Sequence, residues 1–206
     1  LIVVGFFLLG LLAGHSGTLP AWVTQCDISF VALCGLLLCV GIGIGMNPDM
    51  KSDMKSLSPR LALLPLVTIL GSWLGAVVAF LIMSAGDGVV LQHRTLTDCL
   101  ALDSGFAYYS LSSIFITEYR GAELGTIALL ANIIREMITL LLTPLLAKWA
   151  GPLAPISTGG ATTMDTTLPI IAKTIGQKYV ALSIYHGFVT DFTVPFLVTM
   201  WCMMSA

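Results

Sequence analysis

The 206-residue chain is 57% hydrophobic and 10% charged, with a formal net charge of −2 and a mean hydropathy of +0.96. Soluble domains carry about 25% charged residues. This composition therefore excludes an ordinary soluble domain and indicates an all-α polytopic membrane protein. No signature of nucleic-acid binding is present, and the net charge is too small to indicate a charged partner. We expect the lipid bilayer to surround most of this chain.

The cysteines and histidines predict neither a metal site nor a cofactor. No C-x-x-C pair occurs, and the three histidines are far apart in the sequence. Cysteines within apolar segments are typical of small buried hydrophobic residues. We expect no cofactor, no metal and no enzymatic activity. The cysteines are Cys26, Cys34, Cys39, Cys99 and Cys202.

Five apolar segments are candidate membrane spans. The first, Leu1–Ala13, is shorter than the about 20 residues that a spanning helix needs, so we expect it to begin upstream of the sequence given. The loop Asn47–Arg60 has the densest basic cluster, and the positive-inside rule places it in the cytoplasm. In the second span, alternating glycines either allow close packing or line a substrate path. The other spans are Ile28–Met46, Leu61–Met83, Leu124–Ala147 and Tyr179–Met203, and the glycines are Gly41, Gly43 and Gly45.

Two segments, Leu100–Thr117 and Ser157–Thr174, are too polar to face lipid. The second includes G-G-A-T-T-M-D-T-T-L-P, which begins at Gly159 and combines glycines, threonines, a carboxylate and a proline. Unpaired backbone groups and charges are both costly in hydrocarbon. We expect these segments to be re-entrant or broken helices that face water, protein or a substrate.

The polar segments suggest an internal repeat, because each precedes a span with a mid-membrane carboxylate. One ungapped offset superimposes Gly105 on Gly160 and Glu136 on Asp191. If both segments are re-entrant, the chain has about five spans and the repeat is inverted; if both cross, it has about seven spans and a parallel repeat. The charges in the loops do not distinguish these two arrangements, whereas the polarity of the two segments favours the re-entrant one. We predict a three-helix scaffold region, 1–98, and a transport core, 99–206, with repeat units 99–150 and 151–206.

Charges inside the membrane mark the candidate site. Secondary transporters build substrate sites from discontinuous helices near the midplane, and a charge at the bilayer centre costs about 2.5–3.5 kcal/mol on insertion scales. We predict Glu136, Asp165 and Asp191 as the carboxylates that couple protons to substrate. In the alternative, Arg135 pairs with another carboxylate to fix helix packing, while Asn132 satisfies Glu136.

The predicted substrate-binding residues are mainly the polar residues of the two broken segments. His186 is more typical of a core histidine bonded to backbone than of a substrate ligand. The candidates are Ser104, Gly105, Tyr109, Ser110, Ser112, Asn132, Arg135, Gly160, Thr163, Thr166, Thr167 and His186.

Several spaced motifs together resemble the bacterial L-lysine exporter family of the LysO type. They are S-G-F-A-Y-Y-S-L-S from Ser104, Thr117-Glu118, Asn132 with Arg135-Glu136, the segment from Gly159, and H-G-F from His186. The resemblance implies export of L-lysine and its analogue thialysine across the bacterial cytoplasmic membrane, driven by proton antiport. It also implies that Asp165 occupies the position of an essential acid, whereas Asp191 lies outside the family pattern.

The resemblance also implies that full-length members have an additional N-terminal region of about three spans, which the sequence given lacks. Three alternatives are open: a small membrane subunit supplies this region, homodimerisation replaces it, or it belongs to a longer form of this chain. A non-autonomous subunit is therefore one alternative function. The other is an intramembrane aspartyl protease that uses Asp165 and Asp191, although its G-x-G-D and Y-D motifs are absent.

Overall fold

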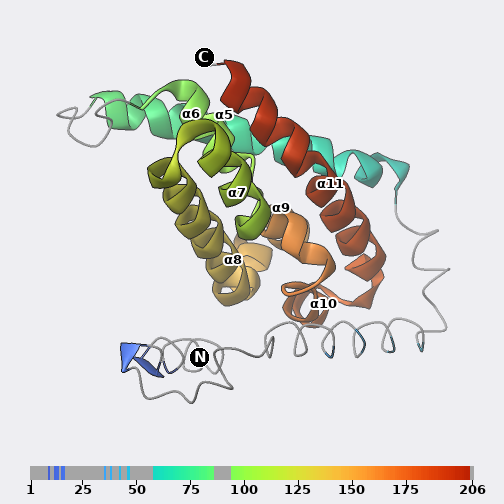
Figure 1. Ribbon diagram of the computed structural model, residues 1–206. Coiled ribbons are helices and arrows are strands. Elements are labelled where there is room, and N and C mark those ends of the chain that lie inside the picture. The colour runs from blue at the N-terminus through green and yellow to red at the C-terminus, as the bar shows by residue number, and fades with distance from the viewer. Residues whose placement is uncertain are drawn as a thin grey trace. The chain divides into compact units, whose positions relative to one another are not determined.

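The computed structural model describes residues 58–85 and 94–204, with scattered positions between residues 9 and 46. The predicted spans Leu1–Ala13 and Ile28–Met46, and most of the loop that follows them, lie outside the described residues. The chain divides into two compact units, and the second, Asp49–Ala206, contains every element discussed below. Its described residues form helices and no strands (Figure 1).

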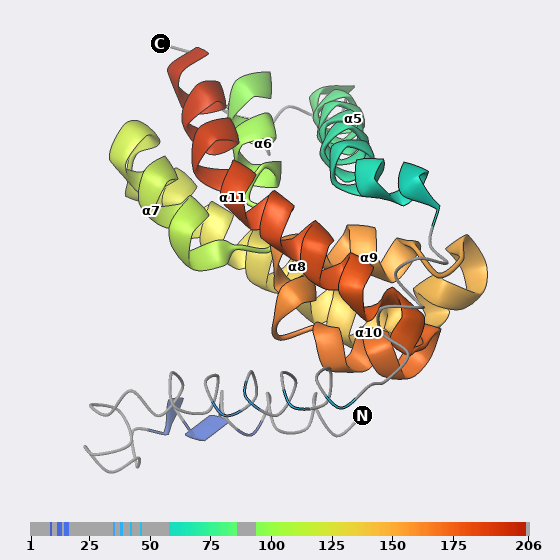
Figure 2. The same ribbon diagram turned by 90° about the vertical axis from the view of Figure 1, so that its right-hand side faces the viewer.

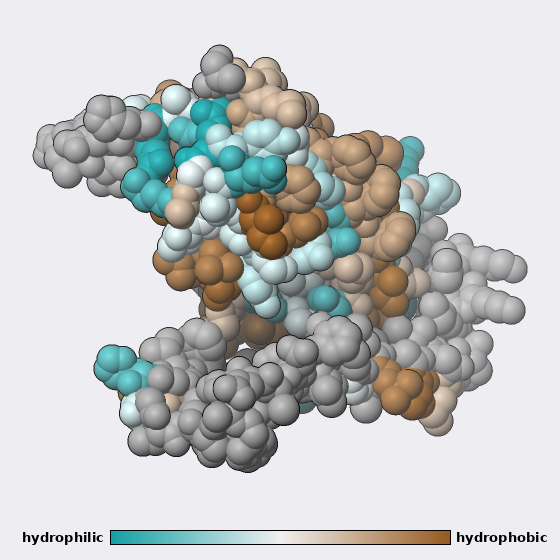
Figure 3. Space-filling view, viewed as in Figure 1, coloured by the Kyte–Doolittle hydropathy of each residue, from teal (hydrophilic) through white to brown (hydrophobic). Residues whose placement is uncertain are grey.

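Three helices in the described part of the chain are long and apolar enough to cross a membrane. They are α5 (Leu64–Ala85) with the 3-10 turn η1 (Pro59–Leu63), α8 (Ala122–Ala150), and α11 (Val180–Met204) with the turn η3 (Gln177–Tyr179). Many large apolar side chains on them are exposed, and brown residues form much of the described surface (Figure 3). This is the surface expected of a helical membrane protein.

The first polar segment is a pair of short helices, α6 (Leu96–Asp103) and α7 (Tyr109–Arg120). Thr95 and Asp98 form a capping box at the start of α6. At the break, Phe106 and Ala107 have φ values of 42° and 69°, a conformation that non-glycine residues rarely adopt. The chain turns back at this break, because the Arg120 guanidinium at the end of α7 lies 3.8 Å from the Asp98 carboxylate near the start of α6.

The second polar segment also turns back on itself. It consists of α9 (Ala154–Gly159), the 3-10 turn η2 (Gly160–Met164) and α10 (Leu168–Ile175). Leu153, before α9, and Ile175, at the end of α10, pack against one hydrophobic cluster together with Leu61. Both ends of the segment therefore lie near the start of α5.

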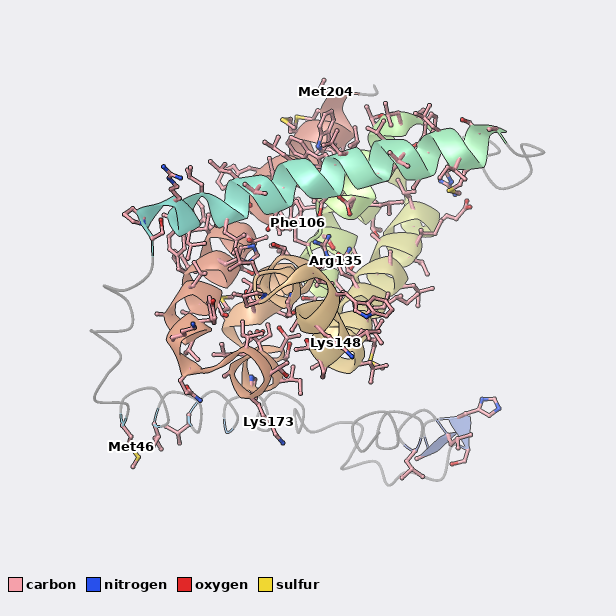
Figure 4. The ribbon with its side chains drawn as sticks, turned by 180° about the vertical axis from the view of Figure 1, so that it is seen from behind. Met46, Phe106, Arg135, Lys148, Lys173 and Met204 are labelled. Carbon is pink, nitrogen blue, oxygen red and sulfur yellow. The ribbon has the colours of Figure 1, made fainter. Side chains whose placement is uncertain are left out.

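The two discontinuous segments belong to opposite ends of this unit. Arg94, before α6, pairs with Glu123 at the start of α8, and α8 then runs to the end that bears Lys148 and Lys173 (Figure 4). Helix α11 returns, and Met204 lies at the opposite end (Figure 4). Figure 2 shows α11 crossing from α10 towards α6. Consequently the breaks of both segments lie between the two ends.

We expect Gly187→Ala to lower the stability of the protein, because α11 packs tightly against η2 at this glycine. A Cβ at position 187 lies 2.6 Å from the backbone nitrogen of Met164 and 2.9 Å from the carbonyl oxygen of Ala161. Backbone cannot move aside as a flexible side chain does, and overpacking costs about 1–3 kcal/mol. Thermal unfolding in detergent should give a lower Tm.

The matched control is Gly75→Ala in α5, where an added Cβ meets nothing within 4 Å. Its Tm should equal or exceed that of the wild type, since alanine favours a helix over glycine by about 1 kcal/mol. An unchanged Tm for Gly187→Ala would contradict the packing described here.

Candidate functional site

The two breaks touch each other in the middle of the unit. The Ala161 amide donates a hydrogen bond of 2.9 Å to the carbonyl of Phe106, and Phe106 is 0% exposed. Gly160 has a φ of +58°, and a Cβ there would lie 2.3 Å from the Phe106 oxygen. Both the backbone angle and the close approach therefore require glycine.

Asn132 on α8 holds the first break in place. Its Oδ1 accepts a 2.8 Å hydrogen bond from the Ala107 amide, and its Nδ2 donates to the Ala128 carbonyl at 2.9 Å. Gly105 packs directly on this side chain, because a Cβ there would lie 2.3 Å from Nδ2. Asn132 thus satisfies backbone groups that the break leaves unpaired. The alternative in which Asn132 satisfies Glu136 is wrong.

Arg135 connects the two discontinuous segments. Its guanidinium lies 5.4 Å from the centre of the Phe106 ring, and Figure 4 shows the two labelled residues near each other in the interior. It also pairs with Asp103 at 3.4 Å. Arg135 therefore pairs with a carboxylate other than Glu136, as expected if its role is to fix helix packing. Its further acceptors are the Thr158 carbonyl at 3.0 Å, the Ser72 hydroxyl at 3.1 Å and the Ser157 carbonyl at 3.3 Å.

Glu136 and Asp165 meet at Thr166. The Thr166 hydroxyl lies 2.6 Å from Glu136 Oε1 and 3.3 Å from Asp165 Oδ1. The Thr166 amide donates to the same oxygen of Asp165. One hydroxyl proton serves one acceptor at a time, so this threonine can stabilise either carboxylate. The structure thus joins a residue of the α8 span to the second break.

Further groups surround this pair. The charges of Glu136 and Asp165 act on the Tyr109 hydroxyl, and the charge of Asp165 acts on Asp191. In the described part of the chain, no basic side chain forms an ion pair with Glu136, Asp165 or Asp191. Like charges in a partly buried site disfavour one another. The group therefore favours a bound cation or a proton.

Several other predicted binding residues form no hydrogen bond with these carboxylates among the described residues. Their side chains form hydrogen bonds with neighbouring groups of the protein. Ser104 accepts a hydrogen bond from Trp73 at 2.9 Å, and Ser112 donates to the Tyr108 carbonyl at 2.8 Å. Thr167 donates to the Thr162 carbonyl at 2.9 Å. These side chains stabilise the breaks. Ser110 is exposed at the start of α7, and no contact of its side chain brings it to the carboxylates.

His186 is a buried core residue. Its Nε2 lies 2.9 Å from the Thr68 hydroxyl, and its Nδ1 lies 3.4 Å from the Thr163 hydroxyl. Thr163 also donates to the Ser183 carbonyl at 2.9 Å. The histidine therefore joins α5, η2 and α11. This fits its interpretation as a core histidine bonded to backbone, because the Gly160 backbone is a hydrogen-bond partner in addition to the two hydroxyls.

Asp103, Ser72 and Thr68 are polar residues that the sequence did not single out as site residues. Asp103 carries a charge in the first polar segment, directly before the Ser104 motif. A charge at that position is the feature of the sequence that could have identified Asp103 as a site residue. Ser72 and Thr68 are ordinary polar residues in an apolar span. Only their contacts with Arg135 and His186 show that they belong with the polar interior.

Comparison with known proteins identifies relatives along nearly the whole chain. The family model described as "Lysine exporter LysO" matches residues 4–202. The Escherichia coli (strain K12) protein named "Lysine exporter LysO" is 31% identical over 194 residues, which are 94% of this chain and 61% of that protein. A Haemophilus influenzae protein, whose name also refers to lysine export, is 32% identical over 165 residues, or 80% of this chain and 79% of that protein.

No solved structure shows significant similarity to the chain. The family match spans both discontinuous segments and all three long helices described above. The resemblance seen in the spaced motifs is thus confirmed. This chain belongs to the LysO lysine exporter family.

Proposed function

We propose that this protein exports L-lysine, and analogues such as thialysine, across the bacterial cytoplasmic membrane in exchange for protons. The observation that carries the proposal is the pair of carboxylates, Glu136 and Asp165, joined by Thr166 without a basic partner in the described residues. The names of the matched relatives supply the substrate. A site of this kind suits an ammonium group, and a proton can replace that group.

The coupling follows from competition for the same negative charge. A protonated carboxylate is neutral and no longer attracts the ammonium group, so entry of a proton favours release of the cation. The Thr166 hydroxyl can donate to Glu136 or to Asp165, so either carboxylate can remain charged while the other is protonated. Asp191 adds to the negative charge around Asp165.

We infer that both discontinuous segments are re-entrant and enter from opposite sides of the membrane. The Asp98–Arg120 pair supports this for the first segment, and the shared cluster of Leu153 and Ile175 supports it for the second. Their following helices, α8 and α11, run in opposite directions. Together these features support an inverted repeat and, with the two spans that the sequence predicts before α5, about five spans in all.

The distribution of basic residues supports one orientation. Lys148, Lys173 and Lys178 lie at the end where α8 finishes and α11 begins. At the opposite end, Arg94 and Arg120 pair with Glu123 and Asp98. By the positive-inside rule the lysine-rich end is cytoplasmic, so the first segment enters from outside.

We expect Asp165→Asn and Glu136→Gln each to reduce lysine transport strongly, because each removes a charge that the ammonium group needs. Loss of one partner of a buried charge pair costs about 2 kcal/mol or more, a drop of at least about thirtyfold. The reduction in transport is measured as the flux of labelled lysine in proteoliposomes with an imposed proton gradient. Glu123→Gln is the matched control, since it makes the same change at an exposed end of α8. Wild-type flux in Asp165→Asn would refute the assigned role.

Labelling of single cysteines tests the re-entrant arrangement. With the native cysteines replaced, Leu96→Cys and Glu118→Cys should both react with a membrane-impermeant maleimide on intact cells, because α6 begins and α7 ends on the outside. Pro152→Cys and Gln177→Cys should react only after permeabilisation. Positions 96 and 118 on opposite sides would instead show that the first segment crosses fully.

A second candidate function is a subunit that works only together with a small membrane protein. The match covers 61% of the length of the E. coli relative. Reconstitution decides between the two. An autonomous exporter transports lysine when the purified chain is the only protein present, whereas a subunit requires co-reconstitution with its partner.

A further inference from the structure

A large cavity lies apart from the Glu136–Asp165 pair. Its volume is about 790 Å³, and among the described residues α5, α6, α8 and the end of α9 form its walls. Ligand pockets typically have volumes of about 300–1,000 Å³, so an amino acid fits. Glu136, Asp165 and Asp191 do not line it. Its polar lining comes from Thr68, Ser72, Asp103, Asn132, Arg135 and the Ser157–Thr158 pair.

Asp103 is poorly satisfied where it borders this cavity. Its Oδ1 has only the long 3.4 Å contact with Arg135, and its Oδ2 is buried without a hydrogen-bond partner among the described residues. A carboxylate can accept about four hydrogen bonds, and an unsatisfied buried acceptor costs about 1–3 kcal/mol. Asp103 therefore has the capacity for a further donor.

Arg135 does not fill this capacity. Most of its donors are directed elsewhere, to the hydroxyl of Ser72 and to the carbonyls of Ser157 and Thr158. These contacts fix the guanidinium at the edge of the cavity, where its charge can attract a carboxylate. The cavity thus presents a negative and a positive group a few ångströms apart, the pattern that a zwitterionic amino acid requires.

We propose that this cavity is a second substrate site, in which Asp103 binds an ammonium group of the exported cationic amino acid. The proposal rests on the proposed function and adds a site to it. The ammonium group donates to Asp103 and to the Ser72 hydroxyl, while the substrate carboxylate faces Arg135. Both charged groups are already in place on α6 and α8.

Neighbouring residues of α8 serve this cavity and the first site. Successive residues of an α-helix point about 100° apart, so Arg135 serves the cavity while Glu136 faces Thr166. The buried Phe106 contacts Arg135 through its ring and accepts the hydrogen bond from Ala161 through its carbonyl. The cavity continues along α5 to Met83 and reaches Cys99, towards the end that we infer to be external. The two sites therefore lie in series along the export path.

Cys99 provides a direct test, because it lines the cavity one helical turn before Asp103. In a variant that retains Cys99 and has serine at the other four cysteines, a small thiol reagent should label Cys99 more slowly when lysine is bound. At lysine concentrations about ten times the dissociation constant, labelling should slow about tenfold. Asp103→Asn should abolish this protection, and Asp103→Glu, which keeps the charge, should retain it.

Asp98→Asn is the matched control. Asp98 lies on the same helix and is more deeply buried than Asp103, but it pairs with Arg120 and does not line the cavity. It should leave protection of Cys99 unchanged. Loss of protection in Asp98→Asn as well, or its persistence in Asp103→Asn, would overturn the assignment to Asp103.

Asp165→Asn separates this inference from the proposed function. Retained protection of Cys99 together with lost transport supports two sites. Lost protection in Asp165→Asn shows a single site and overturns the inference. Absent protection in the otherwise wild-type chain with normal lysine transport also overturns it, yet leaves the proposed function standing. Absent lysine transport in the wild type contradicts the proposed function itself.

Discussion

The contact between Phe106 and the Gly160–Ala161 pair is the constraint on which the interior of this protein depends. Two helices stop within the apolar interior, and each leaves backbone groups without intrahelical partners. Water cannot satisfy them inside a bilayer. The Ala161 amide and the Phe106 carbonyl satisfy each other, so neither break is stable in this form without the other. Gly160 is required because any side chain there would occupy the position of the Phe106 oxygen.

Helix α8 supports this contact from one side. Asn132 binds the backbone of the first break, and Arg135, one turn later, binds the carbonyls before the second. Glu136 then faces Thr166 and Asp165. One short stretch of α8 thus supplies the side-chain amide of Asn132, the cation Arg135 and the carboxylate Glu136 to the interior. This concentration explains why a costly cluster of polar residues sits in the middle of an otherwise apolar helix.

The division of charge around α8 is functionally informative. Arg135 forms an ion pair with Asp103, and none is seen between it and Glu136 or Asp165 among the described residues. Among the described residues, the excess of negative charge therefore lies at Glu136 and Asp165, whereas the Asp103–Arg135 pair is balanced. The Glu136–Asp165 site is suited to a cation, because it has no basic ion-pair partner among the described residues, whereas the balanced Asp103–Arg135 pair suits a group that carries both charges.

The sequence alone determined the membrane class, the three long spans of the described region and the places of both discontinuous segments. Composition and local pattern carry this information, because lipid tolerates neither charges nor unpaired backbone groups. It also marked Glu136 and Asp165, whose charges are conspicuous in apolar surroundings. The family resemblance rested likewise on motifs that are contiguous in the chain.

Only the tertiary structure decided which polar residues are partners. Sequence reasoning offered Asn132 as the partner of Glu136, whereas Asn132 binds Ala107 and Thr166 binds Glu136. It also ranked Asp103 no higher than its polar neighbours. These pairings join residues far apart in the chain, and their geometry depends on how the two breaks approach each other. No local pattern encodes such an approach, because the direction of each side chain is set by the packing of separate helices.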